Sequence, residues 1–290
     1  MHLPTVARLV KKSFRYPFRA VRNGIGAVKF SMLDLAQERE RLFAYLSDAF
    51  DADTDRFQRE LETSEFKQWT QQRRQDLAGF KGPYRFGSTG EWDCEALYYL
   101  VRASRPRTVV ETGVCYGASS SYILEALAHN GSGRLYSIDL GNAPDEPPND
   151  FFVHPAHRRH WLLLIGDSKE VMPPLLEGLG QIDLFHHDSL HTYEHMMWEY
   201  ETAFAHLNPT GALSSDDVGI ILKLSEPFRR SPFADFCDAH GWIWQGVRNF
   251  GMAVNGSPDI ARLRRQRIHS TGAAREDRFS EAPTRVQRRA

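Results

Sequence analysis

The sequence predicts an α/β fold in which a mostly parallel sheet carries helices on both faces, an antiparallel hairpin closes the sheet at its C-terminal end, and helices extend the N-terminus. Short apolar runs alternate with segments of helical spacing between residues 108 and 215. A glycine-bearing turn and a serine cluster follow the first of these runs. Near residue 250, a short turn separates two further apolar runs, as in a hairpin. Strands and helices that alternate in this way form a parallel sheet covered on both faces.

The composition is that of a globular protein. The chain has 290 residues, of which 41% are hydrophobic, and a formal net charge of −1, which disfavours a nucleic-acid-binding protein. Its cysteines, Cys94, Cys115 and Cys237, are widely spaced, so neither a disulfide framework nor a zinc site is predicted. No apolar run reaches the roughly 18–20 residues of a membrane span, and the N-terminus lacks the apolar core of a secretory signal. We therefore expect a cytoplasmic protein.

Both ends of the chain are basic. Residues 1–30 contain Lys and Arg but no acid, and we interpret them as a basic arm. The arm either contacts a membrane surface or an anionic partner, or it is a solvated lead-in to the first helix. A cleaved organelle-targeting peptide is a third interpretation. Residues 258–290 are rich in Arg, and we predict that they form a disordered tail.

Helical spacing precedes the strands. Apolar residues share one face over 32–50 and again over 53–77, with charged residues on the opposite faces. These segments form a predicted helical extension, residues 31–84, which shows no evident chemistry. A glycine-rich loop at 79–90 then leads into a further predicted helix at 91–103.

The main domain is predicted to span residues 85–257. Its parallel strands are placed at 108–111, 134–138, 161–165, 182–187 and 211–215. Helices are placed between them at 119–129, 168–179 and 192–207. A helix at 233–240 and strands at 242–247 and 251–254 complete the domain. The loop over 141–160 is long for a simple connection, which makes it a candidate lid.

Acidic residues mark the carboxyl ends of the predicted strands, the edge at which open α/β sheets bind their ligands. The acidic residues concerned are Glu111, Asp139, Asp167, Asp188, Asp216 and Asp217. After the second strand, a carboxylate can accept both hydroxyls of a ribose, because it offers two acceptor oxygens. After the third strand, Asp167 and the hydroxyl of Ser168 stand where the edge of an adenine would lie. Any one of these residues could instead cap a turn or a helix. Acids at five successive strand ends nevertheless favour a nucleoside site.

The turn after the first strand suits a polar or negatively charged group of a ligand. A helix begins there near Ser119, and the N-terminus of a helix presents unpaired backbone N–H groups. The turn contains Gly113 and Gly117 in the spacing Glu-x-Gly-x-x-x-Gly. A dinucleotide site has an additional glycine in the middle, where the pyrophosphate approaches the backbone. NAD is therefore disfavoured.

Asp188, Asp216 and Asp217 form a second group. In the sheet order expected of such a fold, the fourth and fifth strands lie side by side next to the first, so that these carboxylates converge. Three close carboxylates repel one another unless a cation joins them. Hard oxygen ligands suit Mg²⁺, Ca²⁺ or Mn²⁺, and we predict a divalent metal site. The alternative is that the acids only open a loop and cap the next helix.

The run Glu111 to Ser119, Glu-Thr-Gly-Val-Cys-Tyr-Gly-Ala-Ser, resembles motif I of class I methyltransferases that use S-adenosylmethionine (SAM), in particular the catechol O-methyltransferase group. The runs Asp188 to Glu194, Leu207 to Gly211 and Ser215 to Val218 are similar to those of small-molecule methyltransferases related to macrocin O-methyltransferase and of the cephalosporin hydroxylase group. The resemblance covers about residues 85–255. It implies the Rossmann-like methyltransferase fold, with SAM as the cofactor and Mg²⁺ as the metal.

The resemblance also implies a mechanism, the in-line transfer of a methyl group from SAM to a substrate oxygen. A cation on Asp188, Asp216 and Asp217 would lower the pKa of the acceptor hydroxyl. His191 is the candidate general base, because an imidazole titrates near neutral pH and the catechol enzymes hold a lysine at this place. A purely structural role for His191 is the alternative. Of His186 and His187, strand alternation lets only one face the site.

Two departures from the relatives bear on function. Ser189 and Leu190 stand where the relatives have Gly-Asp, which removes a carboxylate near the substrate, and Thr210 replaces a glycine of a Pro-Gly-Gly turn. The first departure leaves a second function open, a SAM-binding module without activity that serves in assembly or regulation. As an enzyme, the protein is expected to act on a hydroxylated small molecule, such as a sugar, a polyketide, a phenol or a catechol. No nucleic-acid partner is expected, and a homo-oligomer is left open.

Overall fold

The computed structural model describes residues 35–80, 89–218 and 231–256. The predicted basic arm (1–30), the Arg-rich tail (258–290) and most of the predicted loop at 79–90 lie outside the described residues. None of the helices in the three described ranges combines the length and the apolar character that are needed to cross a bilayer.

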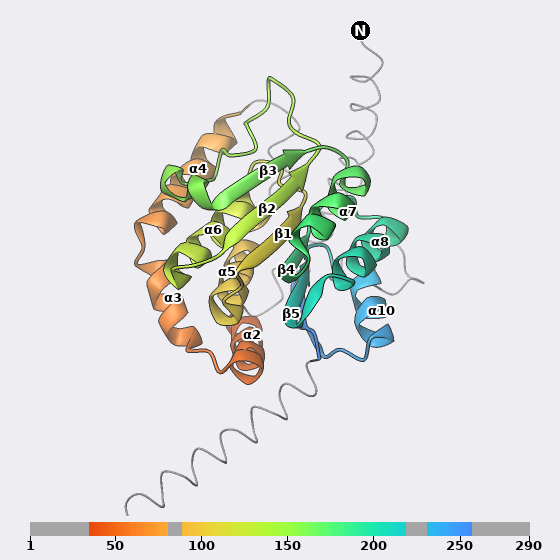
Figure 1. The fold of residues 1–290 in the computed structure, drawn as a ribbon. Coiled ribbons are helices and arrows are strands. Elements are labelled where there is room, and N and C mark those ends of the chain that lie inside the picture. Colours follow the sequence, from red (N-terminus) through yellow and green to blue (C-terminus); the bar gives the residue numbers. More distant parts are fainter. Residues whose placement is uncertain (1–34, 81–88, 219–230, 257–290) are drawn as a thin grey trace, which may run out of the picture.

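A seven-stranded sheet runs through the centre of the protein in the order β3-β2-β1-β4-β5-β7-β6 (Figure 1). Strands β1 to β5 pair in parallel, whereas β7 pairs antiparallel with both β5 and β6. The strands are β1 (Thr108–Thr112), β2 (Arg134–Asp139), β3 (Trp161–Ile165), β4 (Ile182–His187), β5 (Leu207–Ser215), β6 (Trp244–Val247) and β7 (Phe250–Val254). The predicted α/β fold with its C-terminal hairpin is confirmed, and β4 and β5 follow β1 in the sheet as predicted.

Helices cover both faces of this sheet (Figure 1). They are α2 (Leu35–Phe50), α3 (Thr54–Glu62), α4 (Glu65–Gly79), α5 (Glu91–Ser104), α6 (Ala118–Asn130), α7 (Ser168–Leu179), α8 (Tyr193–Phe204), α10 (Pro232–Ala239) and the 3₁₀ helix η2 (Pro155–His160). Successive residues of a strand point to opposite faces, so Val109 packs in the apolar layer formed with α2 to α6 and Val110 in the layer formed with α7, α8 and α10. Both layers are therefore built from the strands that end at the candidate site.

The helical spacing over 53–77 does not correspond to one continuous helix. The structure has two helices there, α3 and α4, with a break at Thr63 and Ser64. The Ser64 side chain accepts a hydrogen bond from the Lys67 N–H and caps α4, and the Thr63 hydroxyl donates to the Arg59 carbonyl at the end of α3. Short hydroxyl side chains compete in this way with the continuing helical backbone, which the apolar spacing alone did not reveal.

The helices of the predicted extension pack onto the main domain. Leu42 and Leu46 of α2 share one apolar cluster with α5 and α6. Arg102 of α5, which is buried, donates to Glu60 of α3, with 2.6 Å between Nη2 and Oε2. Lys67 of α4 forms ion pairs with two glutamates of α5. The extension thus completes the core on one face of the sheet.

At the amino end of the parallel strands, one carboxylate joins three strands. Asp183 of β4 accepts hydrogen bonds from the backbone N–H groups of Arg107 and Thr108, at 2.8 and 2.9 Å, where β1 begins. Its other oxygen accepts from the side-chain amide of Asn208 in β5. Because strands β1, β4 and β5 also carry the acids at the opposite edge, Asp183 helps to set their alignment from the far side.

We expect the Asp183→Ala variant to unfold more easily than the wild type by about 1–3 kcal/mol, because two backbone N–H groups and one amide lose a charged acceptor. Urea unfolding followed by circular dichroism measures the change. Asp145→Ala, which alters an exposed loop residue, is the matched control and should stay within about 0.5 kcal/mol of the wild type. Equal stabilities of the two variants would contradict the role given to Asp183.

Candidate functional site

The turn that follows β1 is tight and lies directly against the segment after β4. Gly113, Cys115 and Gly117 adopt positive φ values of 84°, 53° and 81°. A Cβ added to Gly113 would stand 2.1 Å from the carbonyl oxygen of Asp188. Glycine is therefore required at position 113, and the turn and the Asp188 segment meet backbone to backbone.

Asp139, at the end of β2, anchors this turn. One carboxylate oxygen accepts from the N–H groups of Val114 and Cys115 at 2.9 and 3.0 Å, and the other accepts from the Gly141 N–H at 2.6 Å. A carboxylate has about four lone-pair sites, so acceptor capacity remains for a ligand. Contact with a ribose stays a prediction, and the structure adds a second role for this residue, which is to hold the turn.

Glu111 and Ser119 lie behind the turn and bind one another. Glu111 is fully buried and accepts hydrogen bonds from the hydroxyls of Ser119, Ser120 and Ser137, the last two at 2.6 and 2.7 Å. Burial raises the pKa of Glu111, although the three serine hydrogen bonds act against that rise. These hydrogen bonds fix the start of α6 to strands β1 and β2. Contact of Glu111 and Ser119 with a cofactor stays a prediction.

Asp167 and Ser168 follow β3, and the structure shows the helix cap that was one of the two interpretations of Asp167. Asp167 caps α7 by accepting from the Lys169 N–H at 3.0 Å. Ser168 is buried, and its hydroxyl lies 3.3 Å from Nε2 of His195. A helix cap and a contact with a ligand do not exclude each other, so their predicted place beside an adenine ring stays a prediction.

The acids after β4 and β5 converge, as predicted, but they do so around His191. One ligand atom each of Asp188, His191 and Asp216 lies within 4.8 Å of the others, a spacing that one cation could bridge. Asp217, the third predicted ligand, instead places Oδ2 3.1 Å from Nδ1 of His191. Its other oxygen accepts from the amide of Asn249. Two carboxylates and one imidazole fit a divalent cation.

His191 sits between two carboxylates. Its Nε2 lies 3.5 Å from Oδ1 of Asp188, while its Nδ1 faces Asp217. A carboxylate at one ring nitrogen orients an imidazole and stabilises its protonated form. The ring is therefore placed either to accept a proton from a substrate or to bind a cation next to Asp188 and Asp216.

The structure adds two residues to the site that sequence analysis missed. The hydroxyl of Thr89, just before α5, donates to Oδ2 of Asp188 at 2.8 Å. Asp93, in the first turn of α5, has a pKa raised well above its ordinary value by burial and by the nearby charges of Asp216 and Asp217. Nothing in the local sequence of either residue signalled this, because both are some 100 residues away from the acids they approach.

Glu199 is the third residue that sequence analysis missed. It is fully buried on α8 and accepts from Thr112, His187, Ser189 and His195. Burial alone would raise its pKa, but the charges and hydrogen bonds of His187 and His195 hold it well below the ordinary value. The four-residue spacing of His195 and Glu199 on a helix was a usable signal for this pair. His186 points the other way, next to Phe250, and burial lowers its pKa to about 3.

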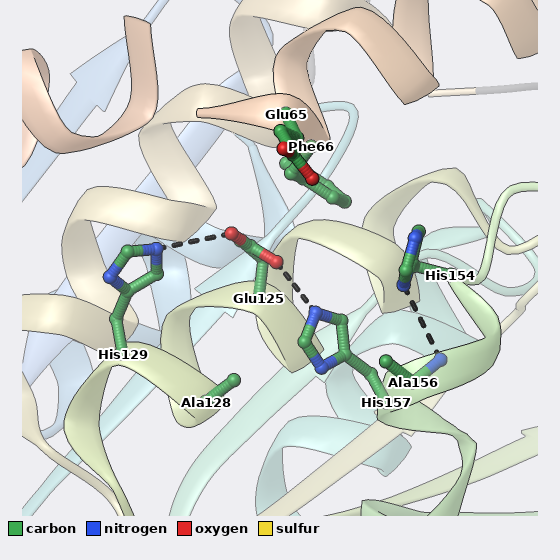
Figure 2. Close-up of a pocket in the computed structure, with 8 residues that line it drawn as sticks. All are labelled: Glu65, Phe66, Glu125, Ala128, His129, His154, Ala156 and His157. Carbon is green, nitrogen blue, oxygen red and sulfur yellow. Dashed lines mark hydrogen bonds and ion pairs between the residues drawn. The ribbon is translucent and has the colours of Figure 1, made fainter. Parts of the chain in front are cut away.

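A pocket of about 430 Å³ lies away from the strand-end acids, between α4, the C-terminal half of α6 and η2. Figure 2 shows Glu125 at its floor, between His129 and His157. The distances from the glutamate oxygens to the two Nε2 atoms are 3.1 and 2.7 Å. Burial by itself would raise the pKa of Glu125, but the hydrogen bonds and charges of the two histidines lower it to about 2. The contacts join α6 to η2.

Comparison with known proteins agrees with this geometry. Residues 110–218, which contain most of β1, all of β2 to β5 and most of the candidate site, match the family model described as a methyltransferase domain. No curated protein sequence matches the chain. The resemblance to methyltransferases drawn from the motifs is therefore confirmed for the part of the chain that carries those motifs.

Two solved structures are similar to this chain at low sequence identity. The O-methyltransferase TomG from Streptomyces achromogenes, involved in tomaymycin synthesis and solved with SAM, is 16% identical; the match covers 64% of this chain and 89% of TomG, with a TM-score of 0.52. An O-methyltransferase from Bacillus cereus, solved with SAH, is 14% identical; the match covers 68% of this chain and 96% of the Bacillus protein, with a TM-score of 0.48. The likeness to TomG establishes the class I methyltransferase fold.

The hydrogen bonds of Glu125 with His129 and His157 predict how the stability of the protein changes in acid. The folded pKa of about 2 lies below the ordinary 4.5, so the stabilisation is present above pH 4.5 and is lost as the pH falls toward 2. It amounts to something on the order of 3 kcal/mol. We expect Glu125→Gln to be less stable than the wild type near pH 6 and to lose less stability on acidification, as measured by thermal unfolding at stepwise lower pH. If the thermal midpoints of the wild type and Glu125→Gln fell equally with decreasing pH, the predicted role of Glu125 would be contradicted.

Proposed function

We propose that this protein is a SAM-dependent methyltransferase that methylates a hydroxyl group of a small molecule or glycan with the help of a divalent cation. One observation supports the proposal above the others: Asp188, His191 and Asp216 come together directly beside the Gly113 turn of a methyltransferase-domain fold. When bound, SAM supplies a methyl group on a sulfonium, and the cation supplies a Lewis acid for the acceptor hydroxyl. The residues of the chain would hold the sulfonium, the cation and the acceptor hydroxyl in position for the transfer.

The proposed SAM site follows the carboxyl ends of β1, β2 and β3. Asp139 would accept a ribose hydroxyl with its remaining lone-pair site while it continues to hold the turn, and Asp167 and Ser168 would line the adenine edge. Gly113 and Gly117 shape the turn, and in the described structure no side chain caps the N-terminus of α6 that follows it. Backbone N–H groups at such an N-terminus suit the polar end of a ligand. Glu111 and Ser119 would support the turn from behind.

Asp188 and Asp216 are the proposed metal ligands on β4 and β5, and Asp217 is the third residue of the predicted set. In the present geometry Asp217 faces His191, so its nearest task is to orient that ring. A ring held at Nδ1 by a carboxylate keeps Nε2 as the nitrogen that can accept a proton. We assign His191 to remove the proton of the acceptor hydroxyl, a step that typically contributes about 10²–10⁴-fold to the rate.

Two features beside the proposed site bear on the substrate class. Leu190 stands where the relatives hold a carboxylate, and it is 51% exposed, so it adds apolar surface beside the site and no charge. The candidate lid over 141–160 is tied to the turn, because the amides of Asn142 and Asn149 both donate to the carbonyl of Cys115. We propose a hydroxylated small molecule as the substrate, a domain spanning 85–257, a cytoplasmic location and no nucleic-acid partner.

Binding of SAM is the first test. We expect isothermal titration calorimetry to show SAM binding by the wild type and a loss of at least about tenfold in affinity for Asp139→Ala, because the variant removes a charged acceptor both from the turn and from the ribose. Asp55→Ala, at an exposed residue of α3, serves as the control with unchanged affinity. A wild type that does not bind SAM would contradict the proposal and leave only the α/β fold.

The metal is tested separately. We expect a heat of Mg²⁺ binding that disappears in Asp216→Asn and persists in Asp238→Asn, an exposed acid on α10. Methyl transfer from radiolabelled SAM to a panel of sugars, phenols and catechols should stop in EDTA. SAM binding with neither a Mg²⁺ heat nor turnover would reject the metal-assisted enzyme and favour the alternative, a SAM-binding module that serves in assembly or regulation.

A further inference from the structure

We propose that Glu199 is a positioning residue that locks the proposed metal segment, His187 to Ser189, against the proposed cofactor turn. The inference rests on the proposed function for the meaning of that site. Glu199 itself faces neither SAM nor substrate, because it is fully buried on α8 beneath the strand ends. Its effect would pass through the groups that it holds.

Four donors from three parts of the chain meet at this one carboxylate. Oε2 accepts from the hydroxyl of Thr112 at 2.5 Å and from Nδ1 of His187 at 2.6 Å. Oε1 accepts from the hydroxyl of Ser189 and from Nε2 of His195, both at 2.8 Å. All lone-pair sites of the carboxylate are therefore in use, and no water is needed to satisfy them.

Two of these donors flank Asp188 in the sequence. His187 precedes it and Ser189 follows it, so the backbone at Asp188 is fixed on both sides. The ring of His187 also packs edge-on against the ring of His191, with 5.3 Å between their centroids. Glu199 thus holds the residues on both sides of Asp188, a proposed metal ligand. It also supports His191, the proposed base, through the ring of His187.

A third donor, Thr112, carries the connection to the cofactor turn. Its hydroxyl binds Glu199, and its carbonyl accepts from the Asp188 N–H at 2.9 Å. The next residue, Gly113, touches the Asp188 carbonyl so closely that a Cβ would not fit. The distance between the turn and the metal segment is therefore determined at Glu199, and in-line methyl transfer is sensitive to displacements of about 1 Å.

Glu125 offers a matched control from the same chain. It too is a buried glutamate on a helix with two histidine partners, His129 and His157. Its partners belong to α6 and η2, and none of them is a residue of the proposed site (Figure 2). A change at Glu125 should therefore report what the loss of a buried Glu–His network does to stability alone.

The experiment compares Glu199→Gln with Glu125→Gln in the full chain. A glutamine offers one acceptor oxygen where Glu199 offers two, so two of the four donors lose their partner. We expect Glu199→Gln to weaken Mg²⁺ and SAM binding, each by about 10–100-fold, the effect typical of residues that orient metal ligands. Glu125→Gln should leave both affinities unchanged, although both variants lower the thermal midpoint.

A second readout does not depend on any ligand. The ring signals of His191 in a ¹H–¹⁵N spectrum, assigned with a His191→Gln variant, should shift in Glu199→Gln and stay in place in Glu125→Gln. If Glu199→Gln fails to fold, Ser189→Ala and Thr112→Val remove one donor each and are expected to shift the same signals. A wild type that binds neither SAM nor Mg²⁺ would refute the proposed function, and the His191 signals would still decide the role of Glu199. Unshifted signals in a folded Glu199→Gln protein would overturn the inference.

Discussion

Charge buried at the carboxyl edge of the sheet is the constraint on which the rest of this structure depends. Glu111 and Glu199 have no solvent access, and an ionised carboxylate that is removed from water costs several kcal/mol unless donors surround it. The chain supplies those donors from neighbouring elements, serine hydroxyls around Glu111 and histidines with hydroxyls around Glu199. Each glutamate therefore joins several elements at one point. The connecting loops alone would fix the relative positions of these elements less well.

The two glutamates and the aspartates have different positions at this edge. The glutamates stand in the interior and hold the turn after β1 and the segment after β4, whereas Asp139, Asp188 and Asp216 come from the last residue of β2 and from just beyond β4 and β5. The division has a simple cause in side-chain length. A glutamate on a helix or within a strand reaches into the gaps between elements, and an aspartate at a strand end stays close to the backbone that presents it. The proposed chemistry then needs only the aspartates and His191 to meet the ligands.

Prediction from the sequence was accurate where local pattern decides structure. Strands β3 and β4 and helix α7 begin and end where the apolar pattern predicted, because the spacing of apolar residues and the polar turns around them are local signals. The break between α3 and α4 was missed, since hydroxyl side chains at Thr63 and Ser64 ended one helix and capped the next while the apolar spacing continued across them. For the site, the strand-end rule placed the acids at the carboxyl edge of the sheet, but it did not indicate that Glu111 is fully buried and enclosed by serine hydroxyls.

The sequence by itself determined where most strands and helices lie along the chain and which acidic residues follow the strands, because these follow from apolar periodicity and from the position of polar residues after each strand. Only the tertiary structure decided which side chains meet. Asp217 faces His191, Thr89 binds Asp188, and Glu199 gathers donors from β1, β4 and α8. A hydrogen bond depends on distance and direction within tenths of an ångström, and groups separated by many residues along the chain reach that geometry only after the sheet and its helices have packed.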